Sequence, residues 1–167
     1  MDLKTTLDQK KETFIAKWFR ATIDTYPSQT TKVLGKSSDR FANPVVALTK
    51  ESISDTFQLF LTDFTPESLE KALDPIIRMR AVQVFSPAEA VGFVFVLKDI
   101  GGSLLNEYEE FSEFNKLVDK VALAAFNKYM KCREEIFLLK AVESKRRIHN
   151  AFERAGLVAE LKEEDLI

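Results

Sequence analysis

The fold is decided by the stretch Met79-Arg80-Ala81-Val82-Gln83-Val84-Phe85-Ser86-Pro87-Ala88-Glu89-Ala90-Val91-Gly92-Phe93-Val94-Phe95. It is typical of a helix end, a short connection and the capped start of a second, very apolar helix. It contains no His, no Cys and no glycine-rich phosphate loop. The most distinctive residues therefore serve packing and connection rather than chemistry, which argues against an enzyme.

The second helix of this stretch begins at a capping box, Ser86-Pro87-Ala88-Glu89, with Pro at the first helical position. Residues 90–97 are apolar nearly all round, which predicts the central and most buried helix of the fold, running to about Leu105. Gly92 removes one side chain from it, so we expect a neighbouring helix to approach closely there.

Three further helices are predicted upstream from apolar residues at helical spacing. The first runs from Thr5 or Thr6 to Thr25 and ends before Tyr26-Pro27, and residues 27–43 are polar and predict a loop. The second begins at Asn43-Pro44 and runs to about Leu61. The third opens at Thr65-Pro66 and carries Asp74-Pro75, where we expect a kink or a break. Asp63 and Asp74 are interpreted as turn and cap groups.

A last helix is predicted from residues 110–112 to about 152, because an apolar stripe continues there without Pro or Gly before Gly156. Roughly 40 residues make a helix about 60 Å long, whereas a compact chain of this size is about 40 Å across. Its C-terminal part is therefore expected to protrude. The sequence predicts an all-α bundle of five to six helices over residues 1–155, followed by an acidic tail over 156–167.

Composition narrows the class of protein. Hydrophobic residues make up 46% and charged residues 30% of the 167, as in an ordinary folded domain. A net charge of −2 argues against a nucleic-acid binder. One His and one Cys do not make a usual zinc site or an internal disulfide. The longest nearly apolar run, residues 90–97, is far shorter than the roughly 20 residues of a membrane span, and the N-terminus lacks an apolar signal core, so we expect a cytoplasmic protein.

Several segments together resemble the RsbRD N-terminal domain family, the N-terminal domain of RsbT co-antagonists. The likeness covers about residues 10–155, and its most specific part is the block from Arg80 to Phe95. The other segments that carry it are Trp18, Tyr26-Pro27, Asn43-Pro44-Val45, Leu73-Asp74-Pro75-Ile76-Ile77-Arg78-Met79 and Tyr129-Met130-Lys131-Cys132-Arg133-Glu134.

This resemblance implies a globin-like sensory domain that binds no haem. In the better-known relatives such a domain forms dimers and precedes a STAS domain in stressosome-type proteins that antagonise the RsbT kinase. The present sequence has no room for a STAS domain after its long helix, so we expect a stand-alone sensor or adaptor and do not transfer RsbT antagonism to it.

Interface residues are predicted where the stripe of the last helix passes beyond the expected body. They are Ile136, Leu139, Val142, Arg146 and His149. His149 lies next to the basic run 145–147, so we interpret it as a surface or interface residue rather than a haem ligand. We expect a homodimer, an unidentified signalling protein as partner, and no haem, metal or other cofactor.

The sequence offers two further candidate sites, each with a plainer structural interpretation. Arg78, Arg80 and Ser86 form a candidate anion site at a helix N-terminus. The plainer interpretation is that these arginines are solvated, or that Arg80 satisfies helix-end carbonyl groups. Cys132 is on the apolar stripe and is better interpreted as a small buried hydrophobe than as a redox sensor.

The phenylalanines are mostly assigned to the core, namely Phe85, Phe93, Phe95, Phe111, Phe114 and Phe126. The sequence thus predicts a non-catalytic sensory or regulatory module that acts through protein contacts. The alternative is a sensor that holds a small molecule in an apolar pocket of the helical core.

Overall fold

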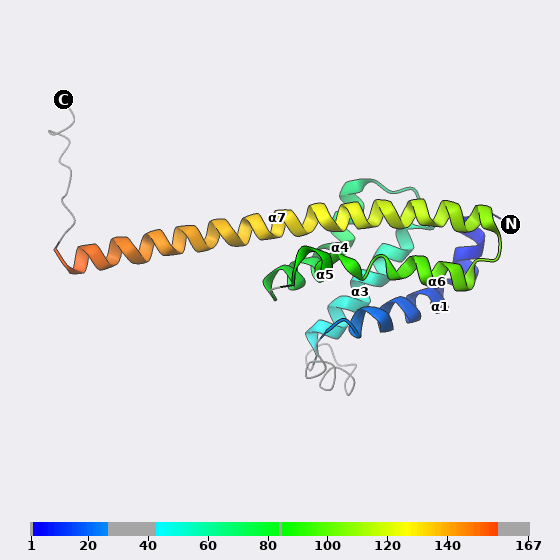
Figure 1. Ribbon diagram of the computed structural model, residues 1–167, viewed down its shortest axis with the longest axis horizontal. Helices are drawn as coiled ribbons and strands as arrows, with labels where there is room; N and C mark the ends of the chain where they lie inside the picture. The colour runs from blue at the N-terminus through cyan, green and yellow to red at the C-terminus, as the bar shows by residue number, and fades with distance from the viewer. Residues whose placement is uncertain (1, 27–42, 84, 157–167) are drawn as a thin grey trace, which may run out of the picture. The chain divides into compact units, whose positions relative to one another are not determined.

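A computed structural model describes residues 2–26, 43–83 and 85–156, and in these ranges the regular structure is helical throughout, with no strand (Figure 1). The all-α prediction and the long last helix are therefore confirmed, while the globin-like arrangement stays a prediction. Residues 27–42 of the expected loop and residues 157–167 of the expected tail lie outside the described residues. The helices are α1 (Leu3–Ile23), α3 (Pro44–Leu59), α4 (Pro66–Val82), α5 (Pro87–Gly92), α6 (Val96–Leu104) and α7 (Tyr108–Arg154).

Side-chain caps mark the helix starts that the sequence indicated. Asn43 accepts a hydrogen bond from the amide of Val46 at the start of α3. Thr65 and Ser68 exchange hydrogen bonds at the start of α4, and Ser86 and Glu89 form the same reciprocal pair at the start of α5. Each cap satisfies amide groups that have no partner inside the helix.

Helix α4 continues through Pro75 to Val82, so the expected break at Asp74-Pro75 is absent. Asp74 is not a cap or turn residue either, because it lies inside the helix. The hydroxyl of Ser52 on α3 donates to the carbonyl of Ala72, 2.6 Å away, close to the point where Pro75 interrupts the backbone hydrogen bonds. Packing against α3 thus supports the helix at its weakest turn.

The expected central helix from Pro87 to about Leu105 is two helices, α5 and α6, and that part of the prediction was wrong. Residues 93–95 separate them, and the amides of Val94, Phe95 and Leu97 bond three residues back instead of four. The carbonyl of Phe93 accepts instead from the indole Nε1 of Trp18, at 2.8 Å. A hydrogen bond from a side chain of α1 therefore replaces one backbone hydrogen bond of the helix.

Two units divide the chain, Met1–Cys132 and Arg133–Ile167. In the first unit, α3 packs against both α1 and α4, α1 also contacts α6, and α4 contacts α5. Aromatic rings fill its centre. Phe14 lies 5.3 Å from both Phe57 and Phe114, measured between ring centroids, and Phe60 meets Phe114 edge-on at 5.8 Å.

The glycine that allows close packing is Gly101 rather than Gly92. Apart from its chain neighbours and the backbone of its own helix, no heavy atom lies within 4 Å of the place where a Cβ on Gly92 would stand, so the expected close helix contact there is wrong. A Cβ on Gly101, by contrast, would collide with the buried ring of Phe114. The close helix contact is therefore between α6 and α7, at Gly101.

Burial along α7 stops at Cys132, which is itself buried as predicted. Every described residue after it is partly or fully exposed. The helix ends just before Gly156, whose φ of 66° is the left-handed conformation that commonly terminates helices. None of the described helices combines the length and apolar character that a membrane span needs.

Candidate functional site

The first candidate site is the outer segment, which we define as residues 133–154 of α7. Large apolar side chains stand exposed along it, in a unit without a described core of its own. Phe137 is 71% exposed, and the others are Leu138, Leu139, Val142, Ile148 and Phe152. A concentration of exposed apolar groups of this kind is typical of a protein-interaction surface.

The interface residues expected from the sequence all lie on this segment. Leu139 and Val142 are exposed, and Ile136 is partly covered. Arg146 pairs with Glu143 at 2.8 Å, and His149 Nε2 lies 3.7 Å from a carboxylate oxygen of Glu153. Hydrogen bonds from Arg146 and then Arg147 hold the pKa of Glu143 below its ordinary value. The predicted role of these residues as an interface stays a prediction.

A second face of the outer segment was missed in the sequence. At 3.6 residues per turn, Phe137, Ala141, Ile148 and Phe152 share one side of the helix, and Leu139 points to nearly the opposite side. All four are exposed. Their spacing of four, seven and four residues was the signal, and the continuous stripe upstream of Cys132 obscured it.

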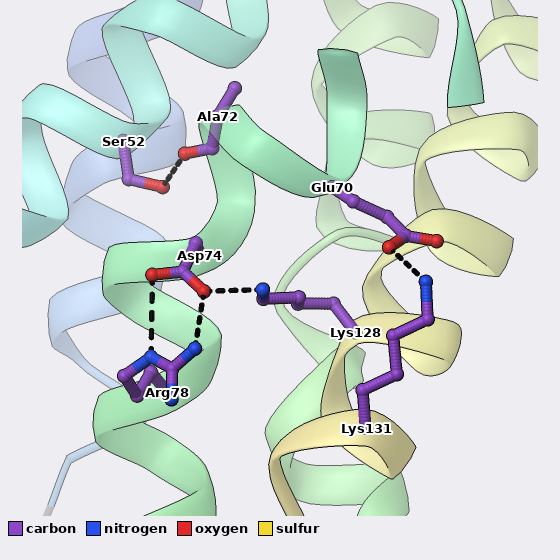
Figure 2. A network of polar contacts seen from close by, with 7 residues as sticks. All are labelled: Ser52, Glu70, Ala72, Asp74, Arg78, Lys128 and Lys131. Carbon is purple, nitrogen blue, oxygen red and sulfur yellow. Dashed lines mark hydrogen bonds and ion pairs between the residues drawn. The ribbon is translucent and has the colours of Figure 1, made fainter. Parts of the chain in front are cut away.

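Two ion pairs bind the last buried turns of α7 to α4 (Figure 2). Lys128 Nζ lies 2.5 Å from Asp74 Oδ1, and Lys131 Nζ lies 2.5 Å from Glu70 Oε2. Arg78 also donates to Asp74, at 3.0 Å. Burial by itself would raise the pKa of Asp74, but hydrogen bonds from Arg78 and Lys128 outweigh it and hold that pKa below its ordinary value.

Arg80 is fully buried at the junction of α1, α4 and α5. Its Nη1 donates to the Glu89 carbonyl at 3.0 Å, and its Nη2 donates to Thr25 Oγ1 at 2.7 Å and to the Thr22 carbonyl at 3.3 Å. Burial lowers the pKa of this guanidinium. In the described ranges no carboxylate pairs with it.

Three aromatic rings surround the Arg80 guanidinium. Its Cζ lies 4.8 Å from the ring centroids of Tyr26 and Phe93 and 5.0 Å from that of Phe85. Cation–π attraction from the ring faces thus supplements the neutral hydrogen-bond acceptors. The sequence did not predict that Arg80 is buried, because an arginine two positions after Arg78 gives no signal for burial.

The residues of the predicted anion site have separate partners. Arg78 donates to Asp74, Arg80 donates to two backbone carbonyls and one hydroxyl, and Ser86 caps the amide of Glu89. The carboxylate of Glu89 in turn accepts from the Ser86 amide, and these hydrogen bonds lower the pKa of Glu89. The anion-site hypothesis stays a prediction.

The second candidate site is a groove of about 590 Å³ in the first unit, which we call the α5–α7 groove. One wall comes from α5 and the turn after it, and the other from α7. Its lining residues are Pro87, Ala88, Val91, Gly92, Phe95, Asp119, Ala122, Leu123 and Phe126. The pocket lies at the surface, between two helices, and not inside the aromatic core.

Two phenylalanines assigned to the core line this groove instead. Phe95 is 47% exposed and Phe126 is 45% exposed, so their assignment was wrong, whereas Phe93 and Phe114 are buried as expected. The break after Gly92 redirects Phe95 away from the core. Over the same described ranges, no three His, Cys, Asp or Glu side chains gather in a way that would hold a metal ion.

The chain matches a known protein family over most of its length. Residues 12–143 match the model of the family described as "RsbT co-antagonist protein rsbRD N-terminal domain". Searches of curated proteins and of solved structures found no match. The matched range includes all of α3, α4, α5 and α6, and it extends along α7 into the outer segment.

Proposed function

Since the chain belongs to the family of the RsbT co-antagonist protein rsbRD N-terminal domain, we propose that it is a non-catalytic sensory and regulatory domain of stressosome-type signalling. It acts through contacts with other proteins, first of all with a second copy of itself. The partner that receives its output is a further signalling protein of unidentified kind.

The observation that carries this proposal is the exposed apolar surface of the outer segment. Phe137, Ile148 and Phe152 share one face of α7, with Ala141 between them. Burial of apolar surface of this kind is the main favourable contribution to most protein–protein association. A second copy has the same face, and two identical faces related by a two-fold axis can cover each other's apolar side chains. We assign this face to the homodimer.

The proposed mechanism is a change in the packing of α7 that the helix carries along its own length. The ion pairs of Lys128 with Asp74 and of Lys131 with Glu70 couple α7 to α4. The same helix continues without interruption from these residues to Arg154. A signal that alters the contacts of α7 in the first unit therefore acts on the helix that carries the outer segment.

Sedimentation of the full chain at tens of micromolar tests the dimer. We expect the intact chain to sediment as a dimer and Phe137→Glu as a monomer, because a carboxylate would be buried in the interface. Val82→Glu is the matched control, since Val82 is similarly exposed but lies at the end of α4.

Leu139→Glu distinguishes the two faces of the outer segment. Leu139 is as exposed as Phe137 but points to nearly the opposite side, so we expect Leu139→Glu to weaken the dimer much less. A monomeric intact chain would refute the homodimer. A dimer lost in Leu139→Glu and kept in Phe137→Glu would transfer the interface to the face predicted from the sequence.

A further inference from the structure

We propose that the α5–α7 groove is a binding site for an uncharged, apolar small molecule. The volume of about 590 Å³ lies inside the range of roughly 300–1,000 Å³ that small-molecule sites occupy. The binding itself is independent of the homodimer, although its meaning as a signal rests on the proposed sensory function.

Gly92 gives the groove its depth. A Cβ at this position would have no heavy atom within 4 Å, so the space beside the backbone is open. A glycine inside a helix is less favourable than an alanine. No neighbouring helix requires this glycine for close packing, and any larger side chain would occupy part of the groove.

The charges around the groove decide which kind of ligand fits. Asp119 is the ionisable residue of the lining, and its Oδ1 lies 2.7 Å from Lys98 Nζ. Lys98 also lies near the face of Phe95, 5.7 Å from the ring centroid. The carboxylate is thus already neutralised at the rim. A charged ligand would lose hydration without gaining a free counter-charge, whereas an uncharged apolar ligand would lose nothing comparable.

The exposed side chains of the groove point to what the ligand would gain. Leu123 is 66% exposed, and Phe95 and Phe126 stand beside the same space on opposite walls. A molecule between them would cover apolar surface from both α5 and α7 at once. Because it would bridge these helices, its binding would bias the packing of α7, which the regulatory mechanism requires.

Titration of the full chain with a matched pair of dyes tests the proposal. N-phenyl-1-naphthylamine is uncharged, and 1-anilinonaphthalene-8-sulfonate is a similar aromatic amine with a sulfonate. We expect saturable binding of about one uncharged dye per chain, with the sulfonate at least about tenfold weaker, which is a difference of about 1.4 kcal/mol. Equal binding of the two dyes would overturn the assignment to an uncharged ligand.

Two substitutions test whether the dye binds in the groove. We expect Gly92→Leu to weaken binding of the uncharged dye at least about tenfold, because the leucine fills the groove. Gly102→Leu is the matched control, since Gly102 is exposed and lies outside the lining. If Gly92→Leu does not fold, Leu123→Glu carries the same test, because Leu123 is exposed and its replacement puts a charge on the groove wall. Unchanged dye binding in the folded variants would refute the site.

The dye-binding test gives an answer that does not depend on whether the proposed homodimer forms. Phe137→Glu changes the outer segment alone and should bind the uncharged dye as the intact chain does. If a second copy covers the groove instead, the intact chain will bind no dye and Phe126→Glu will separate a dimer into monomers. That outcome would overturn the small-molecule site and would place the dimer on the first unit.

Discussion

Gly101 on α6 lies directly against the ring of Phe114 on α7, and a Cβ on Gly101 would stand 2.7 Å from two of its ring carbons. The ring is fully buried and packs against Phe14 and Phe60, so it has no free space into which to move. The absence of a side chain at Gly101 therefore sets the distance between the two helices.

Gly101→Ala should destabilise the protein by about 1–3 kcal/mol, because the added methyl group overpacks the contact with Phe114. Gly92→Ala should instead be neutral or stabilise the protein by up to about 1 kcal/mol, since its Cβ meets open space. Urea unfolding followed by the fluorescence of Trp18, the single Trp, measures both. Equal stability of the two variants would contradict the close contact.

Arg80→Lys should destabilise the protein more than Arg80→Met. Lysine keeps the buried charge but cannot reach the oxygens of Glu89, Thr22 and Thr25 with one forked group. Methionine removes the charge and packs well against aromatic rings. We expect the free energy of unfolding to fall by about 1–3 kcal/mol or more for lysine, because a buried charge would lose hydrogen bonds, and by less for methionine. Urea midpoints give the order, and a more stable lysine variant would show that the charge itself is required.

Asp74→Asn should cost up to about 1 kcal/mol near neutral pH, because it removes the carboxylate that Lys128 and Arg78 share. The pKa of Asp74 is lower in the folded protein than its unfolded value of 3.8. Its stabilising effect is therefore fully present above that value and is lost as the pH falls through the folded pKa.

Urea unfolding of both proteins near neutral pH and at successively lower pH measures this loss. The difference between the intact chain and Asp74→Asn should shrink in acid. Asp63→Asn is the control near neutral pH, since Asp63 is fully exposed in its pair with Lys4 and its replacement should have almost no effect. A difference for Asp74→Asn that persists unchanged in acid would contradict the ion-pair explanation.

Cys132 should react with a thiol reagent at least about a hundredfold more slowly in the folded protein than in urea. Its side chain is buried, so modification requires a local or global opening of the structure that costs several kcal/mol. The rate of thiol modification by absorbance checks this. Rapid modification of the folded chain would instead support the redox-sensing interpretation.

His149→Ala should change the free energy of unfolding by no more than about 0.5 kcal/mol, because His149 is exposed and lies 3.7 Å from a carboxylate oxygen of the equally exposed Glu153. We also expect protein expressed with excess haem to show no Soret absorption. A stoichiometric Soret band that disappears in His149→Ala would overturn both expectations.

Helix starts could be predicted from the sequence because capping is local. Asn43-Pro44, Thr65-Pro66 and Ser86-Pro87 each place a side-chain acceptor and a proline within a few residues of the amides that they satisfy. The long α7 was predictable because an apolar stripe at helical spacing continues along it and no Pro or Gly interrupts it before Gly156.

Only the tertiary structure decided which side chains are covered. The indole of Trp18 donates to the carbonyl of Phe93, which makes no backbone hydrogen bond of the helix, and the resulting turn exposes Phe95. Arg80 is buried because rings from three segments surround it, and Gly101 rather than Gly92 makes the close contact. Capping acts within one turn, so the sequence alone determined the helix starts at Asn43, Thr65 and Ser86. Burial depends on which distant elements meet, and only the folded chain determines that.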